Sequence, residues 1–169
     1  MTPRRLILMR HAKAEPFAAT DHVRELTQRG RRDAVGAGRY LSDAGMVPDH
    51  AVVSSAVRAV QTWEGVCEGL GRTPESVVDD AVFTGSPDVV LEALRTAPDR
   101  AERLMFVGHN PTTAYLAHLL DDGNGEPGAV ARLLEGFPAG ALAVFEVQVP
   151  WAELGEETGR LAAFHAATR

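Results

Sequence analysis

The sequence predicts an α/β fold, a three-layer α/β/α sandwich around a mostly parallel sheet. Three observations support this prediction. Short apolar runs that suit buried strands alternate along the chain with longer segments of helical periodicity. Glycine, proline and helix-capping residues separate the two kinds of segment. The 169 residues, 45% of them hydrophobic, are enough for one compact core, so we expect a single domain over residues 1–169.

Four short runs predict the parallel strands, and two later segments extend the sheet. The four runs are residues 5–9, 51–53, 76–79 and 104–107. Residues 141–149 alternate apolar and polar side chains, which predicts a strand with one face more exposed. Residues 160–165 fit a final edge strand, and residues 121–128, rich in Gly, Asp and Pro, predict a loop.

Cap signals place the helices that connect and follow these strands. Thr27 can cap the first helix, and either Ser54 or Ser55 can cap the second. Ser86 and Asn110 are each followed by a proline, which indicates a cap with proline at the first helical position. The helices expected from these signals span residues 28–44, 57–70, 87–97 and 111–120. Strands that alternate with helices favour right-handed crossovers and a sheet covered on both faces.

Cationic and imidazole side chains follow three of the predicted strands. Arg10 and His11 come directly after the first strand, and His109 comes after the fourth. Arg58 lies in the first turn of the helix that follows the second strand. The C-terminal ends of parallel strands share one edge of a sheet, so we expect these side chains to converge there. Arginine forks and helix N-termini bind phosphate oxygens, which predicts a phosphate-sized anion beside a nucleophilic His11.

Composition excludes several other classes of protein. Lys and Arg number 17 against 23 Asp and Glu, so the net charge of −6 argues against a nucleic-acid partner. Cys67 is the single cysteine, which excludes an internal disulfide and a cysteine zinc site. No stretch reaches the roughly 18 apolar residues of a membrane span, and nothing resembles a signal peptide. We therefore expect a cytoplasmic protein with no membrane partner.

Three stretches together carry a resemblance to a known family. They are residues 8–14 (LMRHAKA), 54–62 (SSAVRAVQT) and 107–111 (VGHNP). In their order and spacing they resemble the signature motifs of the histidine phosphatase superfamily, the phosphoglycerate mutase-like proteins. Residues 24–27 (RELT) are similar to a fourth, weaker element. The short chain and the His-Ala-Lys-Ala form most resemble the SixA-type phosphohistidine phosphatase branch.

The resemblance implies a phosphoglycerate mutase-like fold and a role for each matching residue. His11 would attack phosphorus and carry a covalent phosphoryl group. The side chains that would surround the phosphoryl oxygens are Arg10, Arg58 and His109. Arg24 lines up with a further phosphate-pocket arginine of the SixA-type branch. No metal and no cofactor are implied, and the sequence contains no His-Glu-x-x-His motif.

The proton donor has three candidates. Larger members of the superfamily carry an acidic residue in a helical insertion over the pocket, and this chain is too short for much of an insertion. Asp21, in the loop after the first strand, is the first candidate, and Asp79 and Asp80 are the alternatives. A weak or missing acid would suit a phosphoramidate, because an imidazole leaving group is protonated more readily than an alkoxide.

The expected function is that of a phosphohistidine phosphatase acting on a protein. A short chain without a cap implies an open pocket that can admit a phosphorylated side chain. Two alternatives stay open: a phosphomonoesterase that uses a small phosphorylated substrate, and a weakly catalytic domain that binds a phosphorylated partner. Mutase activity is disfavoured, since a mutase must protect its intermediate from water.

Overall fold

The computed structural model describes residues 2–168. Within this part of the chain, six strands form one mixed sheet in the order β3-β2-β4-β1-β5-β6. The strands are β1 (Arg4–Arg10), β2 (His50–Ser54), β3 (Glu75–Asp79), β4 (Arg103–Gly108), β5 (Leu142–Val147) and β6 (Gly159–His165). The first four run parallel, whereas β5 pairs antiparallel with both β1 and β6. The predicted α/β architecture around a mostly parallel sheet is confirmed.

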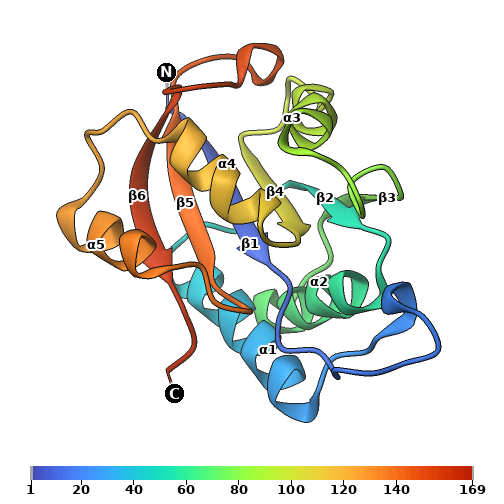
Figure 1. The fold of residues 1–169 in the computed structure, drawn as a ribbon. Coiled ribbons are helices and arrows are strands. Elements are labelled where there is room, and N and C mark those ends of the chain that lie inside the picture. Colours follow the sequence, from blue (N-terminus) through green and yellow to red (C-terminus); the bar gives the residue numbers. More distant parts are fainter. Residues whose placement is uncertain (1, 169) are drawn as a thin grey trace.

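Strand β1 lies in the interior of the sheet, between β4 and β5 (Figure 1). Its apolar residues are fully buried, and alternate side chains point to opposite faces of the sheet. Leu6 and Leu8 belong to the core on one face, and Ile7 and Met9 to the core on the other. The uninterrupted apolar run is therefore explained by a strand that is covered on both sides.

Helices cover both faces of the sheet, and Figure 1 shows the resulting layers. One face packs against α1 (Gln28–Asp43) and α2 (Val57–Leu70). The other packs against α3 (Pro87–Arg95), α4 (Thr112–Leu120) and α5 (Pro127–Glu135). Two short 3₁₀ helices, η1 (Asp21–Val23) and η2 (Trp151–Glu153), lie in connecting segments. No helix within residues 2–168 is long and apolar enough to cross a bilayer.

The caps of α1 and α3 are confirmed, whereas those of α2 and α4 differ from the prediction. The Thr27 hydroxyl accepts a hydrogen bond from the Gly30 N–H at 3.0 Å. Neither serine caps α2, because its N-cap is Ala56, which makes no side-chain cap bond. The Ser54 hydroxyl lies instead 2.7 Å from His109. In α4 the N-cap position belongs to Pro111, one residue later than predicted.

Two features of the C-terminal third were also predicted wrongly. Helix α5 was missed, because the Gly- and Pro-rich composition of residues 121–128 hides its start; the Glu126 carboxylate caps it by accepting from Gly128 and Ala129. Strand β5 has no exposed face. Its alternate residues enter the two cores because helices cover both faces of the sheet at this strand.

Candidate active site

His11 follows β1 directly and is held by hydrogen bonds to two backbone carbonyl groups. Its N–H donates to the Gly108 carbonyl at the end of β4, at 2.9 Å. The His11 Nδ1 lies 2.8 Å from the Ala12 carbonyl oxygen. A carbonyl oxygen can only accept, so Nδ1 carries the ring proton and Nε2 keeps its lone pair when the ring is neutral. The residue is 9% exposed, with its nucleophilic nitrogen turned toward α2.

Arg58, in the first turn of α2, links His11 to the loop that follows β1. Its Nε donates to His11 Nε2 at 3.3 Å. Its two terminal nitrogens donate to Asp21, one to the backbone carbonyl at 2.7 Å and one to the carboxylate at 3.1 Å. Arg58 is 5% exposed, so its charge depends on these partners rather than on water.

Arg10 is held by the segment that precedes β5. Its Nη1 donates to the Phe137 carbonyl at 3.1 Å, and the Asn110 side-chain amide donates to the same oxygen at 2.9 Å. The Gly140 N–H donates to the His11 carbonyl at 2.9 Å. Gly140 has φ +80, a conformation that favours glycine, so the turn it makes can meet the end of β1 closely.

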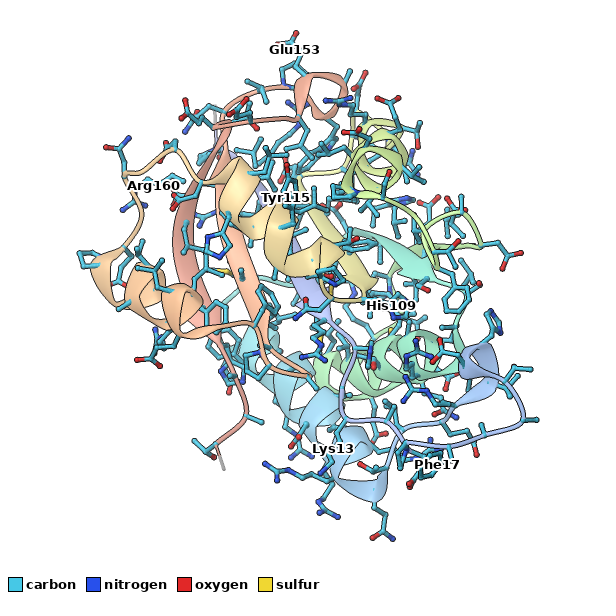
Figure 2. The ribbon with its side chains drawn as sticks, viewed as in Figure 1. Lys13, Phe17, His109, Tyr115, Glu153 and Arg160 are labelled. Atoms are coloured by element: carbon cyan, nitrogen blue, oxygen red, sulfur yellow. The ribbon has the colours of Figure 1, made fainter. Side chains whose placement is uncertain are left out.

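His109 comes from the end of β4 and completes the cluster. Its ring centroid lies 5.2 Å from that of His11, and its Nε2 lies 2.7 Å from the Ser54 hydroxyl. Figure 2 shows His109 between α4 and α2, with Lys13 and Phe17 farther out on the loop after β1. The edge formed by the strand ends therefore brings together the four side chains predicted to converge: Arg10, His11, Arg58 and His109.

Both imidazoles of the cluster are neutral near pH 7. Burial lowers the pKa of His11 to about 4, and the positive charges of Arg58, Arg10 and Arg24 act in the same direction, against the hydrogen bond to Ala12. Burial also lowers the pKa of His109 to about 3, helped by the charge that His11 acquires below about pH 4 and by the charge of Arg58. His11 is thus an unprotonated nitrogen base beside fixed positive charge.

Asp21 and Arg24 lie at η1, on the solvent side of this cluster. The Asp21 carboxylate pairs with Arg58 at 3.1 Å and with Arg24 at 3.0 Å. Burial raises the pKa of Asp21, but the hydrogen bonds from Arg58 and Arg24 outweigh it and hold the pKa below its usual range. Arg24 also donates to the Glu15 carbonyl at 2.9 Å, which fixes it across the loop.

The other two acid candidates lie outside this network. Asp79 ends β3, where its carboxylate accepts a hydrogen bond from the Ala81 N–H at 2.8 Å, and Asp80 is exposed. Across residues 2–168, neither makes a hydrogen bond or ion pair with the four clustered side chains. Of the three candidates, the structure brings Asp21 alone to the site.

Two further side chains, Thr62 and His22, support the site. Thr62 is fully buried; its hydroxyl accepts from the Ala12 N–H at 3.0 Å and donates to the Arg58 carbonyl at 2.6 Å. His22 lies 3.0 Å from the Ser55 hydroxyl and packs edge-on against Phe83. Thr62 stands one helical turn after Arg58, a spacing that could have indicated a shared face. His22 adjoins Asp21 in the sequence, which indicates a place at the rim of the site, but its contacts with Ser55 and Phe83 have no signal in the sequence.

Comparison with known proteins shows the family of this chain. A family model of the histidine phosphatase superfamily (branch 1) matches residues 6–81. An uncharacterized protein of Mycobacterium tuberculosis is 35% identical over 159 residues, which cover 93% of this chain and 98% of the relative. A structure from Nakamurella multipartitia, provisionally assigned as the phosphohistidine phosphatase SixA, has a TM-score of 0.84 and 31% identity. The match covers 98% of this chain and 97% of that one.

A second structure, from Agrobacterium tumefaciens, carries the same provisional assignment. Its TM-score is 0.80 at 28% identity, covering 98% of this chain and 99% of that chain. The chain therefore belongs to the histidine phosphatase superfamily. Within it, the chain is of the SixA type, since the sequence motifs and these full-length structural matches agree. It is an enzyme of the phosphatase class.

Proposed function

We propose that this protein removes the phosphoryl group from a phosphorylated histidine on a protein, through a covalent phosphohistidine at His11. One observation carries the proposal: a buried, neutral His11 presents its unprotonated Nε2 beside Arg58, with Arg10 and His109 adjoining. A nucleophile in its reactive form next to preorganised positive charge is what phosphoryl transfer requires.

In the first step His11 Nε2 attacks phosphorus, and the bond from phosphorus to the leaving nitrogen breaks. The ring gains positive charge as the new bond forms. The Ala12 carbonyl accepts a hydrogen bond from the Nδ1–H at 2.8 Å. This bond stabilises the positive charge and holds the ring in the productive tautomer. Water then attacks the phosphorylated His11 and releases phosphate.

The phosphoryl oxygens are bound by three cationic arginines and one neutral imidazole around His11. Arg58 and Arg10 supply guanidinium donors, and the buried Nε of Arg10 makes no hydrogen bond to any of residues 2–168. His109 supplies an imidazole nitrogen, and Arg24 adds positive charge from the rim. Because these groups are fixed by the protein before the reaction, they stabilise the transition state without reorganisation.

A histidine side chain on a protein is the substrate that the surroundings of the site support best. The 17 residues from His11 to Thr27, between β1 and α1, contain only the single turn η1 as helical structure. This loop supplies no helical insertion over His11, so a side chain on a protein surface can approach. The two structural relatives are provisionally assigned as phosphohistidine phosphatases, which supports the same substrate class.

The test compares the wild-type protein and His11→Ala on two peptides of one sequence, carrying phosphohistidine or phosphoserine. The wild type should release phosphate from the phosphohistidine peptide and form an acid-labile phosphoenzyme. His11→Ala should do neither. A strong preference for the phosphoserine peptide or for small phosphate esters would instead identify a phosphomonoesterase. Tight binding without turnover, unaffected by His11→Ala, would identify a binding module.

A further inference from the structure

The Asp21 carboxylate lies one guanidinium group away from the nucleophile. Arg58 donates from Nε to His11 Nε2 at 3.3 Å and from Nη2 to Asp21 Oδ2 at 3.1 Å. The Asp21 backbone carbonyl accepts from the other terminal nitrogen of Arg58 at 2.7 Å, which fixes the residue by two separate bonds. A phosphoryl group bound between His11 and solvent, against Arg58, therefore has this carboxylate as its neighbour.

The carboxylate is on the side of the site where a leaving group must stand. Attacking and leaving atoms lie roughly in line through phosphorus. His11 is 9% exposed and attacks from the buried side, so the leaving group points toward solvent. The Asp21 side chain is 61% exposed, at the solvent end of Arg58. Its position suits contact with the leaving group rather than with the nucleophile.

Asp21 is also held in its ionised form. Two arginines bind its two carboxylate oxygens, Arg58 at Oδ2 and Arg24 at Oδ1. A carboxylate in this state accepts hydrogen bonds and has no proton to donate. An alkoxide leaving group, which needs a proton, gains nothing from it, and its negative charge is repelled. A leaving group that carries an N–H and positive charge is stabilised.

We propose that Asp21 acts on the substrate as a hydrogen-bond acceptor for the distal N–H of a phosphorylated imidazolium, and so selects phosphohistidine over phosphate esters. The distal nitrogen is the ring nitrogen that is not bonded to phosphorus. The proposal rests on the phosphohistidine phosphatase function proposed above and replaces the role of Asp21 as proton donor.

The resulting transfer is symmetric and needs no proton movement. Neutral His11 attacks with Nε2 while the Ala12 carbonyl holds its Nδ1 proton. The substrate enters as a phosphoimidazolium whose distal proton is held by Asp21. When its P–N bond breaks, the electron pair stays on the substrate nitrogen, and the ring leaves as neutral imidazole with its distal N–H intact. His11 becomes the phosphoimidazolium.

Hydrolysis then restores the enzyme. Water attacks phosphorus, the P–Nε2 bond returns its electron pair to His11, and the phosphate leaves with both protons of the water, as dihydrogen phosphate. His11 is again neutral with its proton on Nδ1. Both steps balance in atoms and charge without a general acid, which explains why a carboxylate kept ionised by two arginines is compatible with turnover.

The experiment measures kcat/KM for phosphoimidazole and for p-nitrophenyl phosphate in the wild type and three variants. p-Nitrophenolate is a good leaving group that needs no proton and has no N–H. In Asp21→Asn the ratio of the two kcat/KM values, phosphoimidazole over ester, should fall by roughly tenfold or more, the scale of a lost charge-assisted hydrogen bond. Asp21→Glu retains the charge and should keep most of the ratio.

Glu25→Gln is the matched control for loss of one negative charge from the same loop. The Glu25 carboxylate contacts Gln61 and Arg31, not Arg58 or His11, so the ratio should not change. An unchanged ratio in Asp21→Asn, or an equal fall in Asp21→Asn and Glu25→Gln, overturns this role for Asp21 and leaves the proposed function standing. Wild-type protein that hydrolyses neither compound nor phosphohistidine peptide overturns the proposed function, and this inference with it.

Discussion

Burial is the main reason that His11 is neutral. The residue is 9% exposed, so water solvates an imidazolium poorly there. The three nearby arginines add to the effect, whereas the Ala12 carbonyl opposes it. The arginines that would bind phosphate thus also help to keep His11 unprotonated. The same side chains would therefore bind the substrate and keep the nucleophile reactive.

The low pKa of His11 should make stability depend on pH. The folded-state pKa of about 4 lies below the ordinary value of 6.5, so the unfolded chain binds more protons between these values. The free energy of unfolding should therefore decrease as pH falls from about 6.5 to about 4, by on the order of 3 kcal/mol for His11. Urea unfolding at a series of pH values measures this.

His11→Gln is the control for that measurement. It removes one of three imidazoles whose pKa is lowered, so the decrease in stability on acidification should be smaller, with the contributions of His109 and His165 remaining. The same slope in the wild type and in His11→Gln would show that other groups cause the pH dependence.

Thr62 should matter to both stability and turnover. Thr62→Val preserves the shape of the side chain but leaves the buried Ala12 N–H without its acceptor, at a cost of about 1–3 kcal/mol. It also removes the link between the residue after His11 and the turn that carries Arg58, so kcat should fall. Thr62→Ser keeps the hydroxyl and should retain both properties. Unfolding curves and phosphatase assays that show no difference between Val and Ser would refute this role.

At the scale of elements, α1 and α2 meet through glycines. A Cβ on Gly38 would stand 2.2 Å from the Val66 carbonyl oxygen, and one on Gly69 would stand 2.1 Å from that of Val35. The two backbones therefore approach more closely than any larger residue allows. Since α2 carries Arg58 and α1 follows the loop with Asp21, this contact sets how the two sides of the site meet.

Two alanine substitutions in α1 should shift stability in opposite directions. Gly38→Ala forces α1 and α2 apart and should lower the free energy of unfolding by about 1–3 kcal/mol. Gly36 is exposed, and a Cβ added there would have no neighbour within 4 Å, so Gly36→Ala should raise it by up to about 1 kcal/mol through helix propensity. Thermal unfolding of both proteins tests this, and the same sign for both would contradict it.

Two of the features that were predicted wrongly share a physical cause. Ser54 was expected to cap α2 from local sequence, but tertiary structure gives its hydroxyl to His109. Strand β5 was expected to have one more exposed face, but helices distant in sequence cover both of its faces. In both cases a partner distant in sequence determines which groups a residue contacts, and the local sequence pattern does not reveal that partner.

At the scale of the whole molecule, the fold class followed from the alternation of strand and helix signals. Arg10, His11 and His109 could be placed at one edge because each lies at or directly after the end of a parallel strand. The ion pairs of Asp21 could not be foreseen, since they depend on how the loop after β1 lies on α2. Thr62 lies in the 54–62 stretch, one helical turn after Arg58, but its hydrogen bond from Ala12 could not be foreseen, because it joins two segments 50 residues apart.

Binding of an oxyanion should stabilise the whole fold. Vanadate or tungstate that binds the native site but not the unfolded chain raises the free energy of unfolding by about 2.7 kcal/mol at a concentration about 100 times Kd. The melting temperature of the wild type should therefore rise with concentration, and that of Arg58→Ala should rise much less. Arg100→Ala, which removes an exposed arginine paired with Glu75, should respond as the wild type does. Equal shifts in all three would place the anion elsewhere.

The Phe137 carbonyl and the Gly140 amide have a consequence for where the chain can be cut. All the signature motifs end before residue 121, yet Arg10 is tethered to Phe137 and the His11 carbonyl to Gly140. A fragment truncated after α4 would keep each signature residue. It would lose the two hydrogen bonds that position Arg10 and His11, and it would also lose β5, the antiparallel partner of β1. The segment that carries the chemistry is therefore shorter than the segment needed to hold it in place.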